Sequence, residues 1–345
     1  MARLRLLGTF CAVAAVVLVG GDRLRPLLPV TGSAEPVESP RPVRLLAVGD
    51  LMLGTSVKSQ ILRHGPDYPF RKYRRLLTGA DVTFGNLETP LSDGGSPTPG
   101  KSAESLKNRT NFLFRTPPIA AAGLSRAGFD YVSLANNHTM DYGPEALRDT
   151  LAALTGAGVT PVGAGEELDS AFAPVYFERN GQTFALFAIS DVLPLGSWAT
   201  ARSPGVAPAR GAEFESRMPA AIREAREQAD HVLVSVHWGK ELYPGATEKQ
   251  QRLGRRLIDW GAEVVIGHHT HCLGPVERYG SGLIHYSLGN FIGPLSTRRD
   301  ASAWELTFVP GEPPLERQHL YRWDGVKRGI KTSAPLPALD PAVSR

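Results

Sequence analysis

Cysteine is scarce in this sequence. Only two of the 345 residues are cysteines, Cys11 within an apolar run near the start and Cys272 far along the chain. Two such cysteines cannot build a disulfide framework or a zinc module with cysteine ligands. Any metal site in this chain must therefore take its ligands from histidine, aspartate, glutamate or asparagine side chains.

The sequence also lacks a strong excess of either charge. Lysine and arginine number 38 and aspartate and glutamate 34, a formal net charge of +4. This balance favours weak attraction to anionic surfaces and is too mild to indicate nucleic-acid binding. Hydrophobic residues make up 42% of the chain, which excludes a disordered protein and is enough for a large globular domain with a substantial core.

An apolar run from Leu6 to Gly21 follows two arginines and precedes Asp22 and Arg23. This pattern predicts an export signal. No small-residue cleavage site is obvious at its end, so we expect residues 1–22 to be an uncleaved signal anchor. The chain would then pass the cell membrane once, with its domain outside. Because the run is slightly shorter than the about 20 apolar residues that span a bilayer, secretion after signal cleavage stays the alternative.

The rest of the chain divides into a linker, one domain and a tail. Residues 23–43 are rich in proline, glycine, serine and glutamate, which predicts an extended linker. From 44 to 310 apolar runs of strand length alternate with helical patterns, the signature of an α/β fold. Residues 311–345 read as an edge segment followed by a loose tail. The predicted strands are 44–48, 82–85, 131–134, 184–189, 231–236, 264–266 and 283–286, the predicted helices are 119–127, 144–156, 212–229 and 247–260, and 92–108 is a predicted surface loop.

The unusual polar residues fall directly after the predicted strands, where ligands gather in α/β sheets. Asp50 follows the first strand, and Asn86 and Glu88 follow the second. Either motif alone is equally well explained by a helix cap or a solvated turn. The third strand ends in Asn136, Asn137 and His138, which would need hydrogen-bond partners if buried. That cluster favours a functional site over a structural turn.

The segment from Gly267 to His271 is the most specific signal. It holds three imidazoles within four positions, which ordinary packing does not explain, and His-x-His can supply two nitrogens to one metal ion or to a pair. His237 follows the preceding strand, and Trp238 beside it is expected to wall a pocket or to stack on substrate. Asn290, after the last strand, is either a pocket residue or part of a simple turn.

Taken in order, the segments GDLMLG, GNLETP, LANNHTMDYG, VHWGKE, VIGHHTH and YSLGNF resemble the CapA family of poly-γ-glutamate capsule biosynthesis proteins. The match extends from about Arg44 to Ile292, and the family is similar in turn to the calcineurin-like metallophosphatases. The resemblance implies a four-layer α/β/β/α sandwich with a metal centre at the strand ends. Imidazoles and hard oxygens together suit one or two divalent ions of Mn, Fe or Zn.

The resemblance also implies roles for individual residues. Met52 stands where those phosphatases carry a ligand histidine, so we expect one metal site to be weakened or absent. Glu88 stands where they usually carry aspartate. The implied metal ligands are Asp50, Glu88, Asn137, His237, His269 and His271, and His138 is the implied proton donor. Residues predicted to bind substrate are Asn86, Asn136, Trp238, Glu241, His268 and Asn290.

The motifs and the resemblance support two alternative hypotheses about function. The first is metal-assisted hydrolysis or transfer at a phosphoryl or acyl group, in the synthesis of poly-γ-glutamate or another capsule. The second is a non-catalytic accessory subunit that binds an anionic polymer and assists a polyglutamate synthase or export complex at the cytoplasmic membrane. A basic stretch motivates the second function, although a solvated helical face also explains it. Its residues are Arg63, His64, Arg71, Lys72, Arg74 and Arg75.

Overall fold

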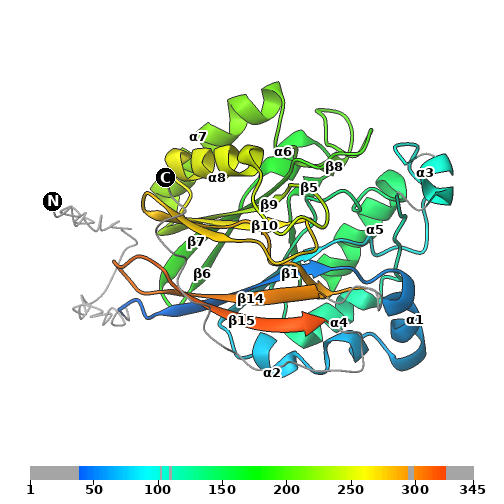
Figure 1. Cartoon of the computed structure of the whole chain (residues 1–345), viewed down its shortest axis with the longest axis horizontal. Coiled ribbons are helices and arrows are strands. Elements are labelled where there is room, and N and C mark those ends of the chain that lie inside the picture. Colours follow the sequence, from blue (N-terminus) through cyan, green and yellow to red (C-terminus); the bar gives the residue numbers. More distant parts are fainter. Residues whose placement is uncertain (1–38, 102, 109–110, 294–298, 324–345) are drawn as a thin grey trace, which may run out of the picture. The chain divides into compact units, whose positions relative to one another are not determined.

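The computed structural model describes residues 39–101, 103–108, 111–293 and 299–323. The predicted anchor over 1–22 and most of the predicted linker lie outside the described residues. Two β-sheets lie face to face in the domain, and helices cover the outer face of each sheet (Figure 1).

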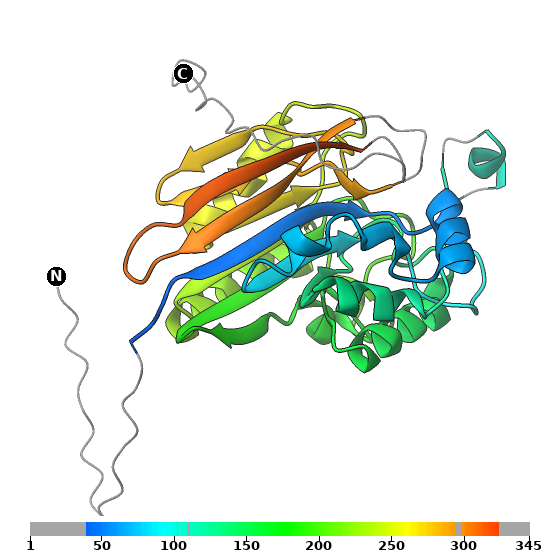
Figure 2. The same cartoon turned by 90° about the horizontal axis from the view of Figure 1, so that it is seen from below.

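The first sheet is built around β1. Its strands run in the order β15, β14, β1, β2, β3 and β4, and β13 also pairs with β1. β1 to β4 are parallel neighbours, whereas β14 and β15 run antiparallel at one edge (Figure 2). The bounds are β1 (Val43–Leu51), β2 (Val82–Leu87), β3 (Tyr131–Ser133), β4 (Thr160–Val162), β13 (Asn290–Ile292), β14 (Arg299–Phe308) and β15 (Leu315–Trp323).

The second sheet has a parallel centre and two antiparallel edges. Its order is β11, β12, β10, β9, β7 and β6, with the middle four strands parallel. The bounds are β6 (Val175–Arg179), β7 (Gln182–Ser190), β9 (His231–His237), β10 (Val264–His268), β11 (Val276–Tyr279) and β12 (Gly282–His285). A separate small ladder joins β5 (Ala164–Gly165) to β8 (Gly205–Val206).

Side-chain alternation along the strands creates three apolar layers. In β1, Leu45 and Ala47 join the core that contains Phe184 and Leu233 of the second sheet, so this core lies between the sheets. Leu46, by contrast, belongs to the cluster with the first set of helices. These helices are α1 (Thr55–His64), α2 (Arg74–Leu77), α4 (Ala120–Ala127) and α5 (Gly143–Gly156).

The outer face of the second sheet packs on a different set of helices, α6 (Leu168–Phe172), α7 (Ala212–Gln228) and α8 (Glu248–Trp260). The predicted four-layer α/β/β/α sandwich is therefore confirmed. No helix within the described residues is both long and apolar enough to cross a membrane.

The predicted elements match observed ones, but others were missed. All seven predicted strands and all four predicted helices correspond to elements of the structure. The predicted loop at 92–108 contains a short helix, α3 (Ala103–Lys107), and a 3₁₀ turn, η1 (Tyr68–Phe70), was not expected. The segment after 310, predicted as an edge segment followed by a loose tail, contributes the edge strand β15, which pairs with β14 along its length. The sheet therefore continues past the predicted domain end.

Candidate metal centre

The position of Asp50 is fixed by a close contact between the backbone at Gly49 and the backbone at Gly289. A Cβ atom on Gly49 would lie 1.9 Å from the carbonyl oxygen of Gly289, so only glycine fits there. The Asp50 N–H donates to the same carbonyl at 2.9 Å, and Asp50 pairs in register with Asn86 of β2 and Asn290 of β13. The carboxylate therefore stands at the carboxyl ends of the parallel strands β1 and β2, beside the first residue of β13.

Two histidines from the second sheet's side face this carboxylate. His268 Nδ1 lies 3.3 Å from Asp50 Oδ1, and His271 Nδ1 lies 3.2 Å from Oδ2. Burial alone would raise the pKa of Asp50, but the adjacent His268 and His271 hold it well below its ordinary value. Burial alone would lower the pKa of His271, yet the Glu88 and Asp50 carboxylates raise it to about 10. Asp50 and His271 thus form a tight pair of opposite charge at the sheet ends.

Glu88 has buried polar atoms whose hydrogen-bonding capacity is unsatisfied. Its side chain is fully buried, and neither carboxylate oxygen has a hydrogen-bond partner among the described residues. Burial and the charge of Asp50 raise its pKa well above the usual value. The nearest imidazole nitrogens are Nε2 of His237 at 3.6 Å and Nε2 of His138 at 3.9 Å. A buried carboxylate left in this state is costly unless it binds a cation.

Glu88 belongs to two groups of potential metal ligands. One consists of Glu88, His237 and His269, and the other of Asp50, Glu88 and His271; the ligand atoms of each group lie within 4.8 Å of one another. Imidazole and carboxylate ligands at this spacing suit a divalent transition metal. The residues present therefore fit the ion that the family resemblance implies. Glu88 is common to both groups and could therefore serve as a ligand in either.

Two of the histidines in these groups, His237 and His269, are kept in the form that binds a metal. Burial, with the positive charge of neighbouring histidines, lowers the pKa of His237 well below its usual value and that of His269 to about 3. Both imidazoles are therefore neutral, the form that ligates metals. His269 and His271 have φ angles of 91° and 56°, in the strained left-handed region. Such strain clusters at functional sites, and here it aims two side chains of one turn into the centre.

Asn137 and Met52 complete the description of the ligand positions. Asn137 Oδ1 lies 2.8 Å from His237 Nε2, so this amide oxygen borders the first ligand group. Met52 is buried, and its N–H donates to Ile292 O. The second ligand group contains three side chains without any contribution from Met52. The weakened site predicted from Met52 thus keeps Asp50, Glu88 and His271.

His138 lies at the edge of the centre with its two nitrogens in different surroundings. Nε2 faces Glu88, and Nδ1 lies 2.8 Å from Asp141 Oδ2 and 3.0 Å from Lys101 Nζ. The ring stacks on Phe114 with centroids 4.2 Å apart. Burial lowers the pKa of His138, although Asp141 opposes this effect. The ring is thus fixed on one side and presents its other nitrogen to the ligand groups.

Comparison with known proteins identifies the family. The family described as bacterial capsule synthesis protein PGA_cap matches residues 44–294, a range that includes every residue of the centre. The chain belongs to this family. This chain is 33% identical to the capsule biosynthesis protein CapA of Bacillus anthracis over 247 residues, which cover 71% of this chain and 58% of the relative. The chain thus spans less than two thirds of that protein's length.

Two further similarities are more distant. A Mycobacterium tuberculosis protein described as a "Probable polyglutamine synthesis accessory protein" is 30% identical over 297 residues, which cover 74% of this chain and 75% of that protein. Among solved structures, the sulfate thiohydrolase SoxB of Thermus thermophilus is similar at 15% identity and a TM-score of 0.43, over 76% of this chain and 45% of the other. The predicted membership of the CapA family is confirmed by the family match and by the identity to CapA.

Asn86 and Asn136 form side-chain hydrogen bonds that link residues of the centre to one another. Asn86 Nδ2 donates to Asp50 Oδ1 at 2.8 Å, and Asn136 Nδ2 donates to Asn86 Oδ1 at 3.1 Å. Asn136 Oδ1 accepts the N–H groups of His138 and Thr139, each at 3.0 Å. Both asparagines were predicted to bind substrate. The structure instead uses their polar atoms to brace the ligand turn.

The prediction for Trp238 is wrong. Its side chain is buried between the second sheet and the helices, and its Nε1–H donates to Tyr286 O at 3.0 Å. It therefore cannot stack on substrate. The strand alternation that points His237 into the centre sends the next side chain to the opposite face of the sheet.

The other predicted substrate residues lie at or near the centre. Glu241 is exposed, and its charge contributes to the raised pKa values of Glu88 and His271. His268 is fully buried beside Asp50 and Phe84. Asn290 Oδ1 lies 2.8 Å from His271 Nδ1 and so orients that imidazole. Of the six predicted substrate residues, Glu241 alone is exposed.

Lys101 was missed by the sequence analysis, and Asp141, although part of the motif after the third strand, was given no role. The segment around Lys101 was predicted to be a surface loop, yet the lysine is 4% exposed and contacts His138. Nothing in the sequence around Lys101 signals this burial. Asp141 could have been found, because it follows His138 by three residues in the same motif.

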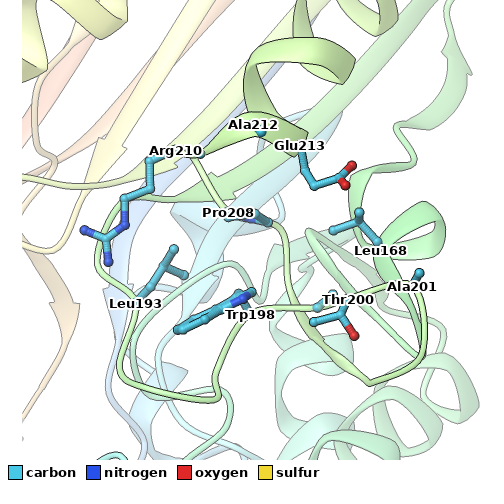
Figure 3. A pocket seen from close by; sticks show the side chains of 11 residues that line it. Leu168, Leu193, Trp198, Thr200, Ala201, Pro208, Arg210, Ala212 and Glu213 are labelled. Atoms are coloured by element: carbon cyan, nitrogen blue, oxygen red, sulfur yellow. The ribbon is translucent and has the colours of Figure 1, made fainter.

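A cavity of about 540 Å³ lies apart from the centre. Its lining is mainly apolar, with Trp198 and Leu193, and its charged lining residues are Arg210 and Glu213 near the start of α7 (Figure 3). None of the predicted site residues lines this cavity.

Proposed function

We propose that this chain is a metal-dependent hydrolase in the synthesis of poly-γ-glutamate or another capsule, acting on a phosphoryl or acyl group outside the cell. The observation that supports this proposal most is the buried Glu88 carboxylate, which has no hydrogen-bond partner in the described part of the chain and is common to two ligand groups. A purely structural role would leave two buried oxygens of Glu88 without a partner, at a cost of about 1–3 kcal/mol for each.

Each side chain of the centre has a definite task in this proposal. Glu88, His237, His269 and Asn137 would hold one ion, and Asp50, Glu88 and His271 another, of Mn, Fe or Zn. A bound ion would polarise the scissile group and lower the pKa of a coordinated water. His138 points Nε2 toward Glu88 and would donate a proton there to the departing oxygen.

The proposed location is the outer side of the cell membrane. The apolar run after the first arginines supports an anchor there, and secretion after cleavage is the alternative. Polyglutamate synthase or export subunits are the proposed partners. The relative described as a polyglutamine synthesis accessory protein and the CapA relative support a role beside such machinery.

Metal content and hydrolysis of the full-length protein test this function together. The protein would be loaded with Mn, Fe or Zn, its metal measured by mass spectrometry, and its rate measured on bis(p-nitrophenyl) phosphate and on γ-glutamyl p-nitroanilide. We expect metal-dependent turnover of one substrate class, lost in Glu88→Gln. Glu305→Gln is the matched control, because Glu305 is also a buried carboxylate but lies in β14, paired with Arg44. Equal rates in metal-stripped and loaded protein would contradict the proposal.

A second candidate function is supported by the basic stretch around α1 and α2. Arg63, His64, Arg71, Lys72, Arg74 and Arg75 are all exposed and therefore free to meet an anionic polymer. If this protein is a non-catalytic accessory subunit, charge reversal of these residues should weaken its binding to poly-γ-glutamate. Reversal of Arg252, an exposed arginine of α8, is the control. Unchanged polymer binding after reversal of the stretch would exclude this candidate.

A further inference from the structure

The cavity of about 540 Å³ has the size and the lining of a small-molecule site. It is lined by residues of the segment 193–211, which follows β7, and by the first residues of α6 and α7 (Figure 3). Small-molecule sites in proteins occupy roughly 300–1,000 Å³ and have mostly apolar walls with a few polar groups. Here Leu168, Leu193, Trp198 and Pro208 supply the large apolar surfaces. The cavity can therefore enclose the apolar body of an organic molecule.

Backbone hydrogen bonds hold the wall that carries Trp198 in place. The Ala199 N–H donates to Val206 O at 2.9 Å, and the Val206 N–H donates to Ser197 O at 3.0 Å. Both neighbours of the tryptophan are thus bonded to β8, which in turn pairs with β5. A wall fixed in this way is formed before a ligand arrives, so binding does not have to order it.

Two hydrogen-bond donors of the lining are unpaired within the described part of the chain. Arg210 is exposed, and its guanidinium has no ion pair or hydrogen bond to any described residue. The Nε1–H of Trp198 likewise has no acceptor among these residues. Guanidinium and indole groups can donate hydrogen bonds but cannot accept them. The unpaired groups of the cavity therefore favour a ligand with acceptor atoms.

The other polar side chains of the lining already have partners. The Glu213 carboxylate accepts a hydrogen bond from Arg217 Nε at 2.9 Å, and Thr200 Oγ1 lies 2.6 Å from Ser203 Oγ. In the view of Figure 3, Glu213 lies across the cavity from Arg210. Arg210 thus brings to the cavity a positive charge that no described carboxylate pairs with, and a negatively charged ligand group would complement it.

We propose that this cavity binds a small aromatic carboxylate. The ring would pack against Trp198 and Leu193, and the carboxylate would meet the Arg210 guanidinium, whose planar fork of N–H donors matches it. Apolar contact would supply most of the affinity, because an ion pair with an exposed arginine adds about fivefold or less. No residue of the two metal-ligand groups lines the cavity, so this inference does not rest on the proposed function.

The indole signal of Trp198 reports binding at this place. In the metal-free full-length protein labelled with ¹⁵N-tryptophan, Trp198→Phe identifies this signal among those of the five tryptophans. The probes are 2-naphthoate and 2-naphthamide, which share one apolar body and differ in charge. We expect a saturable shift of the Trp198 signal with both probes, and about fivefold tighter binding of 2-naphthoate.

Removal of single charges locates the contact with the anion. Arg210→Gln should weaken the binding of 2-naphthoate to the level of 2-naphthamide and leave the binding of 2-naphthamide unchanged. Arg202→Gln is the control, at an exposed arginine of the same segment that does not line the cavity, and should keep both wild-type affinities. Because Arg210 is exposed, its replacement should leave the fold intact.

Three results would overturn the proposal. They are the absence of a saturable shift of the Trp198 signal, equal affinity of the wild type for the two probes, and an unchanged preference for 2-naphthoate in Arg210→Gln. Each of them leaves the proposed hydrolysis unaffected, because the probes are titrated without metal. The expected preference in a protein that hydrolyses nothing supports the cavity as a binding site and contradicts the proposed function.

Discussion

His237 Nε2 lies 2.8 Å from Asn137 Oδ1, although 100 residues separate them in the chain. His237 ends β9 of the second sheet, and Asn137 follows β3 of the first. The metal centre is therefore assembled from both sheets, and its geometry depends on how they pack.

A bound ion should stabilise the fold, because its ligands come from both sheets. At a free metal concentration about 100 times the dissociation constant, the free energy of unfolding should rise by about 2.7 kcal/mol. Thermal unfolding with and without metal measures this. Glu88→Gln should remove the increase, whereas Glu305→Gln should keep it. A melting temperature that metal leaves unchanged in the wild type would argue against ion binding at this place.

His138→Gln should separate binding of the metal from proton donation. His138 belongs to neither ligand group, so the metal content should stay at the wild-type level. The value of kcat should fall by about 10²- to 10⁴-fold, the usual contribution of a general acid. Mass spectrometry and steady-state kinetics on the same preparation provide both measurements. Loss of the metal together with the rate would show that His138 is a ligand instead.

Gly49→Ala should destabilise the protein and disturb Asp50. The added methyl group would meet the Gly289 carbonyl at 1.9 Å, so the strands must shift, with an expected loss of about 1–3 kcal/mol in the free energy of unfolding. Gly156→Ala is the control, because a Cβ atom at this position in α5 meets nothing within 4 Å. Urea unfolding compares the two. Equal stability of the two variants would contradict the close backbone approach.

His285 should make the protein sensitive to acid. Burial, aided by the charge of His268, lowers its pKa from 6.5 to about 3 in the folded state. Between pH 6.5 and pH 3 the His285 imidazole is protonated in the unfolded chain but not in the folded chain. The free energy of unfolding therefore decreases as the pH falls from 6.5 toward 3. The loss between pH 7 and pH 5 should be about 2 kcal/mol. Chemical denaturation over this range should show a shallower pH dependence in His285→Phe. A parallel dependence in both proteins would contradict a neutral, buried His285.

The sequence predicted the interior strands and most of the centre because local pattern determines both. Val82–Leu87 and His231–His237 are apolar runs with polar residues at their ends, a pattern that can be read without a structure. β14 could not be predicted in this way. Its Ser302 and Glu305 interrupt the apolar pattern, and they are tolerated because Glu305 pairs with Arg44 across the sheet. The burial of Lys101 could not be predicted either, because it depends on an ion pair with Asp141, 40 residues later in the sequence.

The pairing of β14 with β1 shows that the folded domain extends beyond the range of the family match. The family match ends at residue 294, but β14 pairs with β1 along Val43–Val48, the strand that leads to Asp50. A chain cut at the end of the match would leave that side of β1 with unpaired N–H and C=O groups, a template for aggregation. The range that the family model matches is therefore shorter than the unit that folds. Expression of the isolated domain should extend at least through Trp323.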